Sequence, residues 1–115
     1  MRVQIRRHGI EASEELNQQV LRRIRFALGR FSTNIRSIGV HLTDTNGPRG
    51  GTDKECRILV NTRSGDPVVI QELNVDIHAA VALAAERAGR AVARQLSVRR
   101  VGNGNARPAP AASGE

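Results

Sequence analysis

The alternation of apolar and polar residues in the middle of the chain is the feature that most constrains its fold. Three segments there carry apolar residues at every second position, and most of the residues between them are polar or glycine. Their apolar positions are Ile38, Val40, Leu42, Cys56, Ile58, Val60, Val68 and Ile70. A period of two predicts β-strands, and apolar residues on a single phase predict a sheet that needs cover on only one face.

Segments with helical periodicity lie on either side of these strands. Ser13 is a good N-cap for a helix that runs to about residue 31, and Asn74 or Asp76 can cap a second helix that runs to about residue 96. Both helices carry one apolar stripe, as expected for helices that cover a sheet. The stripes are Leu16, Val20, Ile24, Ala27, Leu28 and Phe31 in the first helix, and Ile77, Val81, Ala84, Ala88, Val92 and Leu96 in the second.

A short strand over residues 1–7 completes the predicted order, β-α-β-β-β-α. The β-α-β step is right-handed and makes the first two strands parallel neighbours, and two hairpins then add the others antiparallel. We expect an α+β fold, a two-layer sandwich in which a four-stranded sheet carries two helices on one face. The 115 residues allow one domain, expected over residues 1–96, and the Gly, Asn, Pro and Ala of residues 97–115 predict a flexible tail.

The charge of the chain is strongly positive and unevenly distributed. Lys and Arg number 18 against 11 Asp and Glu, for a net charge of +7, and every cation except Lys54 is an arginine. The net charge is +5 over residues 1–36, −1 over residues 37–75 and +3 over residues 76–115. A GC-rich genome would explain the ratio of Arg to Lys but not the net charge. A basic domain of this size indicates a polyanionic partner.

Arginines on the outward faces of the two predicted helices form the candidate RNA-binding site. The candidates are Arg22, Arg23, Arg25 and Arg30 of the first helix, Arg87, Arg90 and Arg94 of the second, and Arg6 and Arg7 of the first strand, with Arg36, Arg99 and Arg100 as extensions. Helices that lie side by side on one sheet would join their arginines into a single positive surface. The arginines of either helix, taken alone, could simply form a solvated helix face. Acidic residues that would neutralise the arginines of the first helix are nearly absent, however, which favours a binding surface.

The aromatic content narrows the kind of nucleic acid. The chain has no Trp or Tyr and only two Phe, Phe26 and Phe31, and its predicted strands carry no aromatic residue. A stacking platform on the sheet is therefore excluded, which leaves recognition of phosphates and shape by helices and so favours folded RNA. Phe31 belongs to the apolar stripe, whereas Phe26 either stacks on a base or packs against a neighbour.

No pattern for catalysis, metal or cofactor binding is visible, so we expect no enzyme. His8, His41, His78 and Cys56 share no metal-ligand spacing, and Cys56 is in phase with the core positions of its strand. The loop 46–51 has glycines but lacks the Gly-Lys-Ser/Thr ending of a phosphate-binding loop. The longest apolar run has seven residues, 79–85, and the first residues lack the apolar segment of a signal peptide. We expect a cytoplasmic protein.

Two stretches of the chain carry a resemblance to a known family. The first is residues 5–13, leading into Leu16, residues 20–24 and Phe31; the second is Asp76–Leu83, followed by Glu86, Arg87 and Arg90. In this order and spacing they resemble the ribosome hibernation-promoting factor family, also known as ribosome-associated inhibitor A or sigma-54 modulation proteins, in its short form. The resemblance covers about residues 1–96.

The resemblance implies a fold similar to that of double-stranded-RNA-binding domains. It also implies a translation inhibitor that occupies the mRNA–tRNA channel of the small ribosomal subunit, with rRNA as partner and no membrane or small-molecule substrate. The positions that match the family's basic helix residues, and would contact rRNA phosphates, are Arg22, Arg23, Arg87, Arg90 and Arg94. Two alternatives stay open, a general module for structured RNA and a regulator that binds proteins.

The chain also departs from the family pattern. His78 stands where an aromatic residue is expected, and Gly29 and Gly89 stand where charged helix residues are usual. Gly89 costs its helix about 1 kcal/mol relative to alanine, and the pattern offers no reason for it. The C-terminal dimerisation domain of long-form members is absent, so we expect a monomer off the ribosome that does not by itself join two ribosomes.

Overall fold

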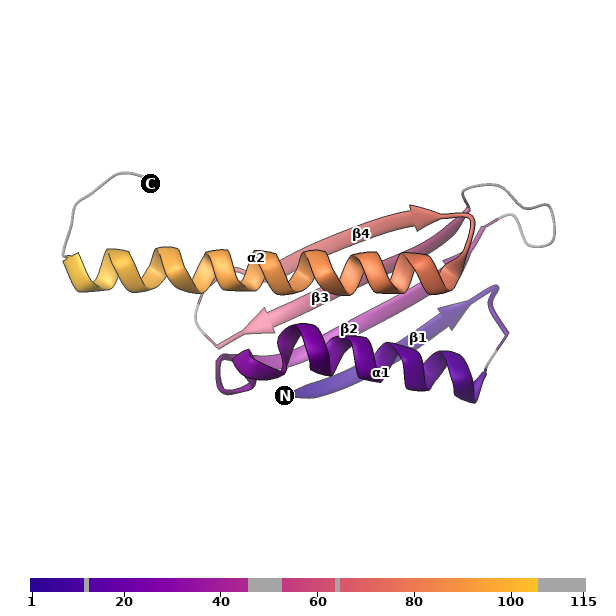
Figure 1. The fold of residues 1–115 in the computed structure, drawn as a ribbon, viewed down its shortest axis with the longest axis horizontal. Coiled ribbons are helices and arrows are strands. Elements are labelled where there is room, and N and C mark those ends of the chain that lie inside the picture. Colours follow the sequence, from indigo (N-terminus) through magenta and orange to yellow (C-terminus); the bar gives the residue numbers. More distant parts are fainter. Residues whose placement is uncertain (12, 46–52, 64, 106–115) are drawn as a thin grey trace.

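The computed structural model describes residues 1–11, 13–45, 53–63 and 65–105, and side chains as far as residue 97. Its elements follow the predicted β-α-β-β-β-α order (Figure 1). They are β1 (Arg2–His8), α1 (Glu14–Leu28), a 3-10 helix (Gly29–Asn34), β2 (Ile35–Asp44), β3 (Lys54–Thr62), β4 (Val68–Asn74) and α2 (Ile77–Asn105). The predicted loop 46–51 lies outside the described residues.

The four strands form one sheet in the order β1-β2-β3-β4. β1 and β2 are parallel, and β3 and β4 each pair antiparallel with the preceding strand, as predicted. The register aligns Ile5, Val40, Ile58 and Ile70 in one row across the sheet. Figure 1 shows both helices on one side of this sheet, so the predicted two-layer α+β sandwich is confirmed.

Helix α1 begins where its cap predicts and ends earlier than its apolar stripe predicts. The Ser13 hydroxyl accepts a hydrogen bond from the backbone N–H of Leu16 at 3.3 Å, which satisfies one free N–H of the first turn. The α-helix ends at Leu28 and continues as a 3-10 helix, so Phe31 lies half-buried in that tighter segment.

Helix α2 is longer than predicted. The Asp76 carboxylate caps it by accepting from the backbone N–H of His78 at 3.0 Å. The helix continues to Asn105, past the predicted end near residue 96, and Figure 1 shows its last turns projecting beyond the sheet. No proline interrupts it before position 108, and Gly102 and Gly104 weaken a helix without necessarily ending it. Of the predicted tail 97–115, residues 97–105 are thus helical, and residues 106–115 lie outside the described part.

The two helices touch directly at Gly89, which explains that residue. A Cβ placed on Gly89 would lie 2.9 Å from the carbonyl oxygen of Ala27 and 3.3 Å from the Ala27 Cβ. Side chains larger than hydrogen would therefore push α1 and α2 apart. Fully buried alanines at 80, 84, 85 and 88 keep the rest of α2 close to the sheet and to α1.

We expect Gly89→Ala to lower the free energy of unfolding by about 1–2 kcal/mol, because overpacking against a backbone carbonyl outweighs the gain in helix propensity. Urea denaturation followed by circular dichroism measures this change. The matched control is Gly29→Ala, where an added Cβ meets nothing within 4 Å. An equal or higher stability of Gly89→Ala than of this control would contradict the close-contact explanation.

Candidate nucleic-acid interface

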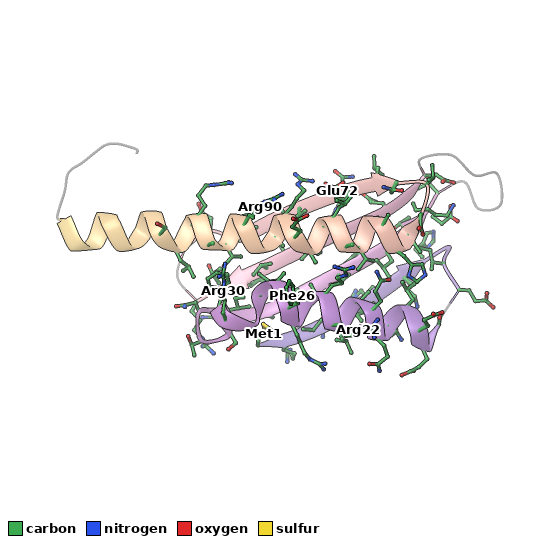
Figure 2. The ribbon with its side chains drawn as sticks, in the orientation of Figure 1. Met1, Arg22, Phe26, Arg30, Glu72 and Arg90 are labelled. Atoms are coloured by element: carbon green, nitrogen blue, oxygen red, sulfur yellow. The ribbon has the colours of Figure 1, made fainter. Side chains whose placement is uncertain are left out.

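The outer surface of α1 and of the 3-10 helix that follows it carries arginines without a carboxylate partner in the described part of the chain. Arg22, Arg23, Arg25 and Arg30 are all exposed, and among the described residues none of them forms an ion pair. The Arg30 guanidinium lies 4.7 Å from the centre of the Phe31 ring, which orients it without removing its charge. All four arginines are therefore at the surface, where a polyanion can reach them. Figure 2 labels Arg22 and Arg30.

The arginines of α2 do not all join the single positive surface predicted for the two helices. The Arg90 side chain contributes to a groove between the helices and lies 3.5 Å from the Glu86 carboxylate, in an exposed pair one turn apart. Arg87 instead reaches the edge strand β4. Its Nη1 donates to the backbone carbonyl of Gln71 at 2.8 Å and to the Glu72 carboxylate at 2.5 Å.

The helical geometry explains this division. Residues three apart differ by about 60° around the axis, which separates Arg87, in contact with β4, from Arg90, which lines the groove. Arg94, seven residues after Arg87, returns to within about 20° of it. Arg94 is exposed, and this spacing puts it on the same side of α2 as Arg87, toward β4. The predicted merging of the helix arginines therefore includes Arg90 but not Arg87.

The arginines of β1 divide between the two faces of the sheet. Arg7 lies on the helix side, half-buried, and its Nη1 donates to the Asn17 side-chain oxygen on α1 at 2.7 Å. Arg6 is exposed on the opposite face, where it aligns with His41 and, one strand further, with Arg57. The prediction that Arg6 extends the helical surface is therefore wrong, because neighbouring residues of a strand point to opposite faces. Arg36 is exposed at a register irregularity of β2.

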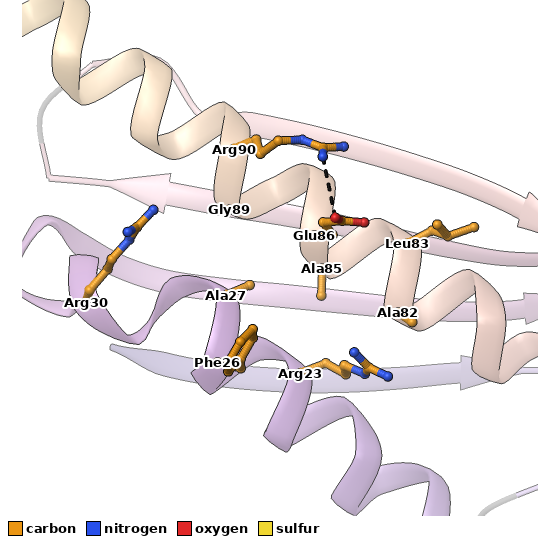
Figure 3. Close-up of a pocket in the computed structure, with 10 residues that line it drawn as sticks. All are labelled: Arg23, Phe26, Ala27, Arg30, Ala82, Leu83, Ala85, Glu86, Gly89 and Arg90. Atoms are coloured by element: carbon orange, nitrogen blue, oxygen red, sulfur yellow. Dashed lines mark hydrogen bonds and ion pairs between the residues drawn. The ribbon is translucent and has the colours of Figure 1, made fainter.

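A groove of about 470 Å³ lies between α1 and α2 (Figure 3). Arg23 lines it from α1, Arg30 from the 3-10 helix that follows α1, and Arg90 from α2. Its other lining residues are Phe26, Ala27, Ala82, Leu83, Ala85, Glu86 and Gly89. We name these ten residues the interhelical groove. Leu83 was not among the predicted site residues, although it lies off the apolar stripe of its helix and so could have been recognised as exposed.

The described residues contain no group of three or more His, Cys, Asp and Glu side chains arranged to hold a metal ion. Cys56 is fully buried, as its strand phase predicted, and burial together with Glu55 and Glu72 raises the pKa of its thiol to about 12. None of the described helices is long and apolar enough to cross a membrane.

The comparison with protein families matches residues 3–100 to the family described as Sigma 54 modulation protein / S30EA ribosomal protein. The chain belongs to this family. The match covers most of β1 and α2 and every element between them, and it confirms the family predicted from the two sequence stretches. No curated protein matches the chain in sequence.

Two solved structures share the fold of this S30EA-family chain. A ribosomal subunit interface protein from Coxiella burnetii superposes with a TM-score of 0.70 at 15% identity, over 84% of this chain and 99% of its own. The N-terminal domain of Protein Y from Thermus thermophilus gives a TM-score of 0.67 at 19% identity, over 83% of this chain and 99% of its own. At these identities the likeness establishes the shared fold.

The contact of Arg87 with β4 predicts a structural role that the arginines of α1 lack. We expect Arg87→Gln to lower the free energy of unfolding by about 0.5–1 kcal/mol, because it removes a partly exposed ion pair and a hydrogen bond to a carbonyl. Arg22→Gln is the control and should change stability by less than about 0.5 kcal/mol. Equal stabilities of the two variants in urea denaturation would contradict this assignment.

Proposed function

We propose that this protein binds the small ribosomal subunit through its helix layer and occupies the channel in which mRNA and tRNAs lie. Translation would stop while the protein is bound, and the ribosome would be held idle. Membership of a family described as S30EA ribosomal protein supports ribosome binding, as does the fold shared with a ribosomal subunit interface protein. The observation that carries the RNA-binding part is the set of arginines on α1 without carboxylate partners.

The chemistry of these arginines fits rRNA phosphates. A guanidinium presents a planar fork of donors that can bond two phosphate oxygens, and it keeps its charge at any physiological pH. We propose Arg22, Arg23, Arg25, Arg30 and Arg90 as the principal phosphate contacts. This mode of action requires only occupancy, so the protein would act as a monomer without cofactor or catalysis, in the cytoplasm where ribosomes are.

The remaining predicted residues would contribute less. Arg7 and Arg87 already have partners within the fold, which RNA would have to replace. Arg94 is exposed on the β4 side of α2 and would contact RNA that extends past the groove. Arg6 would contribute only through the overall charge, because it lies on the far face of the sheet.

The test is co-sedimentation with purified small subunits at moderate salt in the presence of excess structured competitor RNA. We expect saturable binding that survives the competitor. The triple variant Arg22→Ala, Arg23→Ala, Arg90→Ala should bind at least about tenfold more weakly, and the log–log slope of affinity against salt should be smaller by about 2–3.

The matched control removes the same charge from the other face of the sheet. Arg2, Arg6 and Arg57 are exposed there, and their triple replacement by Ala should weaken binding by less than about threefold. Equal losses in both triples would reduce the interaction to non-specific attraction. Binding that competitor RNA removes would leave a general RNA-binding module, and binding that neither triple affects would indicate a protein partner.

A further inference from the structure

An apolar site lies in the middle of the most basic surface of this protein. Phe26 on α1 is 89% exposed, more than any other large hydrophobic side chain in the described part of the chain. Leu83 on α2 is 42% exposed and lines the same interhelical groove. An aromatic ring that is almost completely in water contributes little to folding, so packing within the domain does not explain Phe26.

The groove beside Phe26 has the size and lining of a ligand site. Its volume of about 470 Å³ falls within the range of small-molecule pockets, about 300–1,000 Å³. Gly89 and the alanines at 27, 82 and 85 form its lining between the helices, because side chains this small leave the space open. Phe26 and Leu83 supply larger apolar side chains from the two helices (Figure 3).

The positive charges around the Phe26 ring favour a ligand that carries negative charge. Arg23 precedes Phe26 by three residues on α1 and Arg30 follows it by four, in the 3-10 helix, and both line the same groove as the ring. Arg90 faces them from α2, and the one carboxylate that lines the groove, Glu86, is paired with it. A suitable ligand combines a flat apolar group with negative charge a few ångströms away, which describes a nucleotide.

A second copy of this chain is a poor occupant, because each copy carries a net charge of +7 and the cations surround the groove. A duplex is also unsuitable, because its bases are stacked on each other and paired. We propose that the interhelical groove receives one unpaired nucleobase of folded RNA. The base stacks on Phe26 beside Leu83, and the adjacent phosphates bind Arg23 and Arg30. This inference rests on the proposed RNA-binding function. It adds to the phosphate contacts a stacking contact, which salt does not screen.

The test compares two hairpin RNAs that differ at a single position, where one has a bulged adenosine and the other an abasic nucleotide of the same charge. We expect the adenosine hairpin to bind the wild-type protein about 5- to 100-fold more tightly, the range that base–aromatic stacking covers. Phe26→Ala should abolish this preference and leave the salt slope unchanged. The control Val69→Ala, at a 59% exposed position on the opposite face of the sheet, should retain it.

Fluorescence supplies an independent reading, because the chain contains no Trp or Tyr. In Phe26→Trp the new indole is the only such fluorophore, and the adenosine hairpin should quench it more strongly than the abasic hairpin. A folded Phe26→Trp protein with equal quenching by both RNAs overturns the proposal.

The outcomes separate this inference from the proposed function. Equal affinities of the wild-type protein for the two hairpins would overturn the base site, as would failure of both to bind at low salt. The proposed function would still stand if small subunits bind and the triple Arg variant does not. If Phe26→Ala weakens binding to small subunits without any preference between hairpins, Phe26 contacts a ribosomal protein and the base site is likewise overturned.

Discussion

The direct contact between the two helices at Gly89 and Ala27 is the constraint on which the functional surface depends. A four-stranded sheet has room for two helices on one face only if they lie close together, and here a missing side chain permits that approach. The contact brings arginines from the two ends of the chain to one groove. Glycine disfavours a helix, and alanine offers little side chain for packing. Gly89 and the alanines of α2 nevertheless allow the close approach that places Arg23, Arg30 and Arg90 together.

Much of the fold could be predicted because most elements have one dominant apolar phase. The strands from Ile38 onward and the stripe from Leu16 to Leu28 each allow one orientation, and the order of elements then allows one topology. The end of α2 was less predictable, because glycines weaken a helix without necessarily ending it. The role of Gly89 was not visible at all, since it depends on a neighbour more than sixty residues away.

The site was predictable only in part, for the same reason. Spacing along a helix identifies outward residues but not which side of the outward face each one takes. Arg87 therefore pairs with Glu72 on β4, while Arg90, three residues later, faces the groove. The strand alternation that places Val3 and Ile5 beneath the helices also places Arg6 on the far face. Exposure of Phe26 followed from its phase, but its position beside Leu83 required the three-dimensional arrangement.

The exposure of Phe26 and Leu83 also bears on colloidal behaviour. Apolar groups in water favour self-association, and what opposes it here is the mutual repulsion of copies that each carry seven net positive charges. Added electrolyte weakens that repulsion at the same time as it releases a basic protein from a polyanion. If the protein binds RNA as proposed, the unbound protein is least protected from aggregation under the ionic conditions that release it, and its solubility would depend on the presence of that partner.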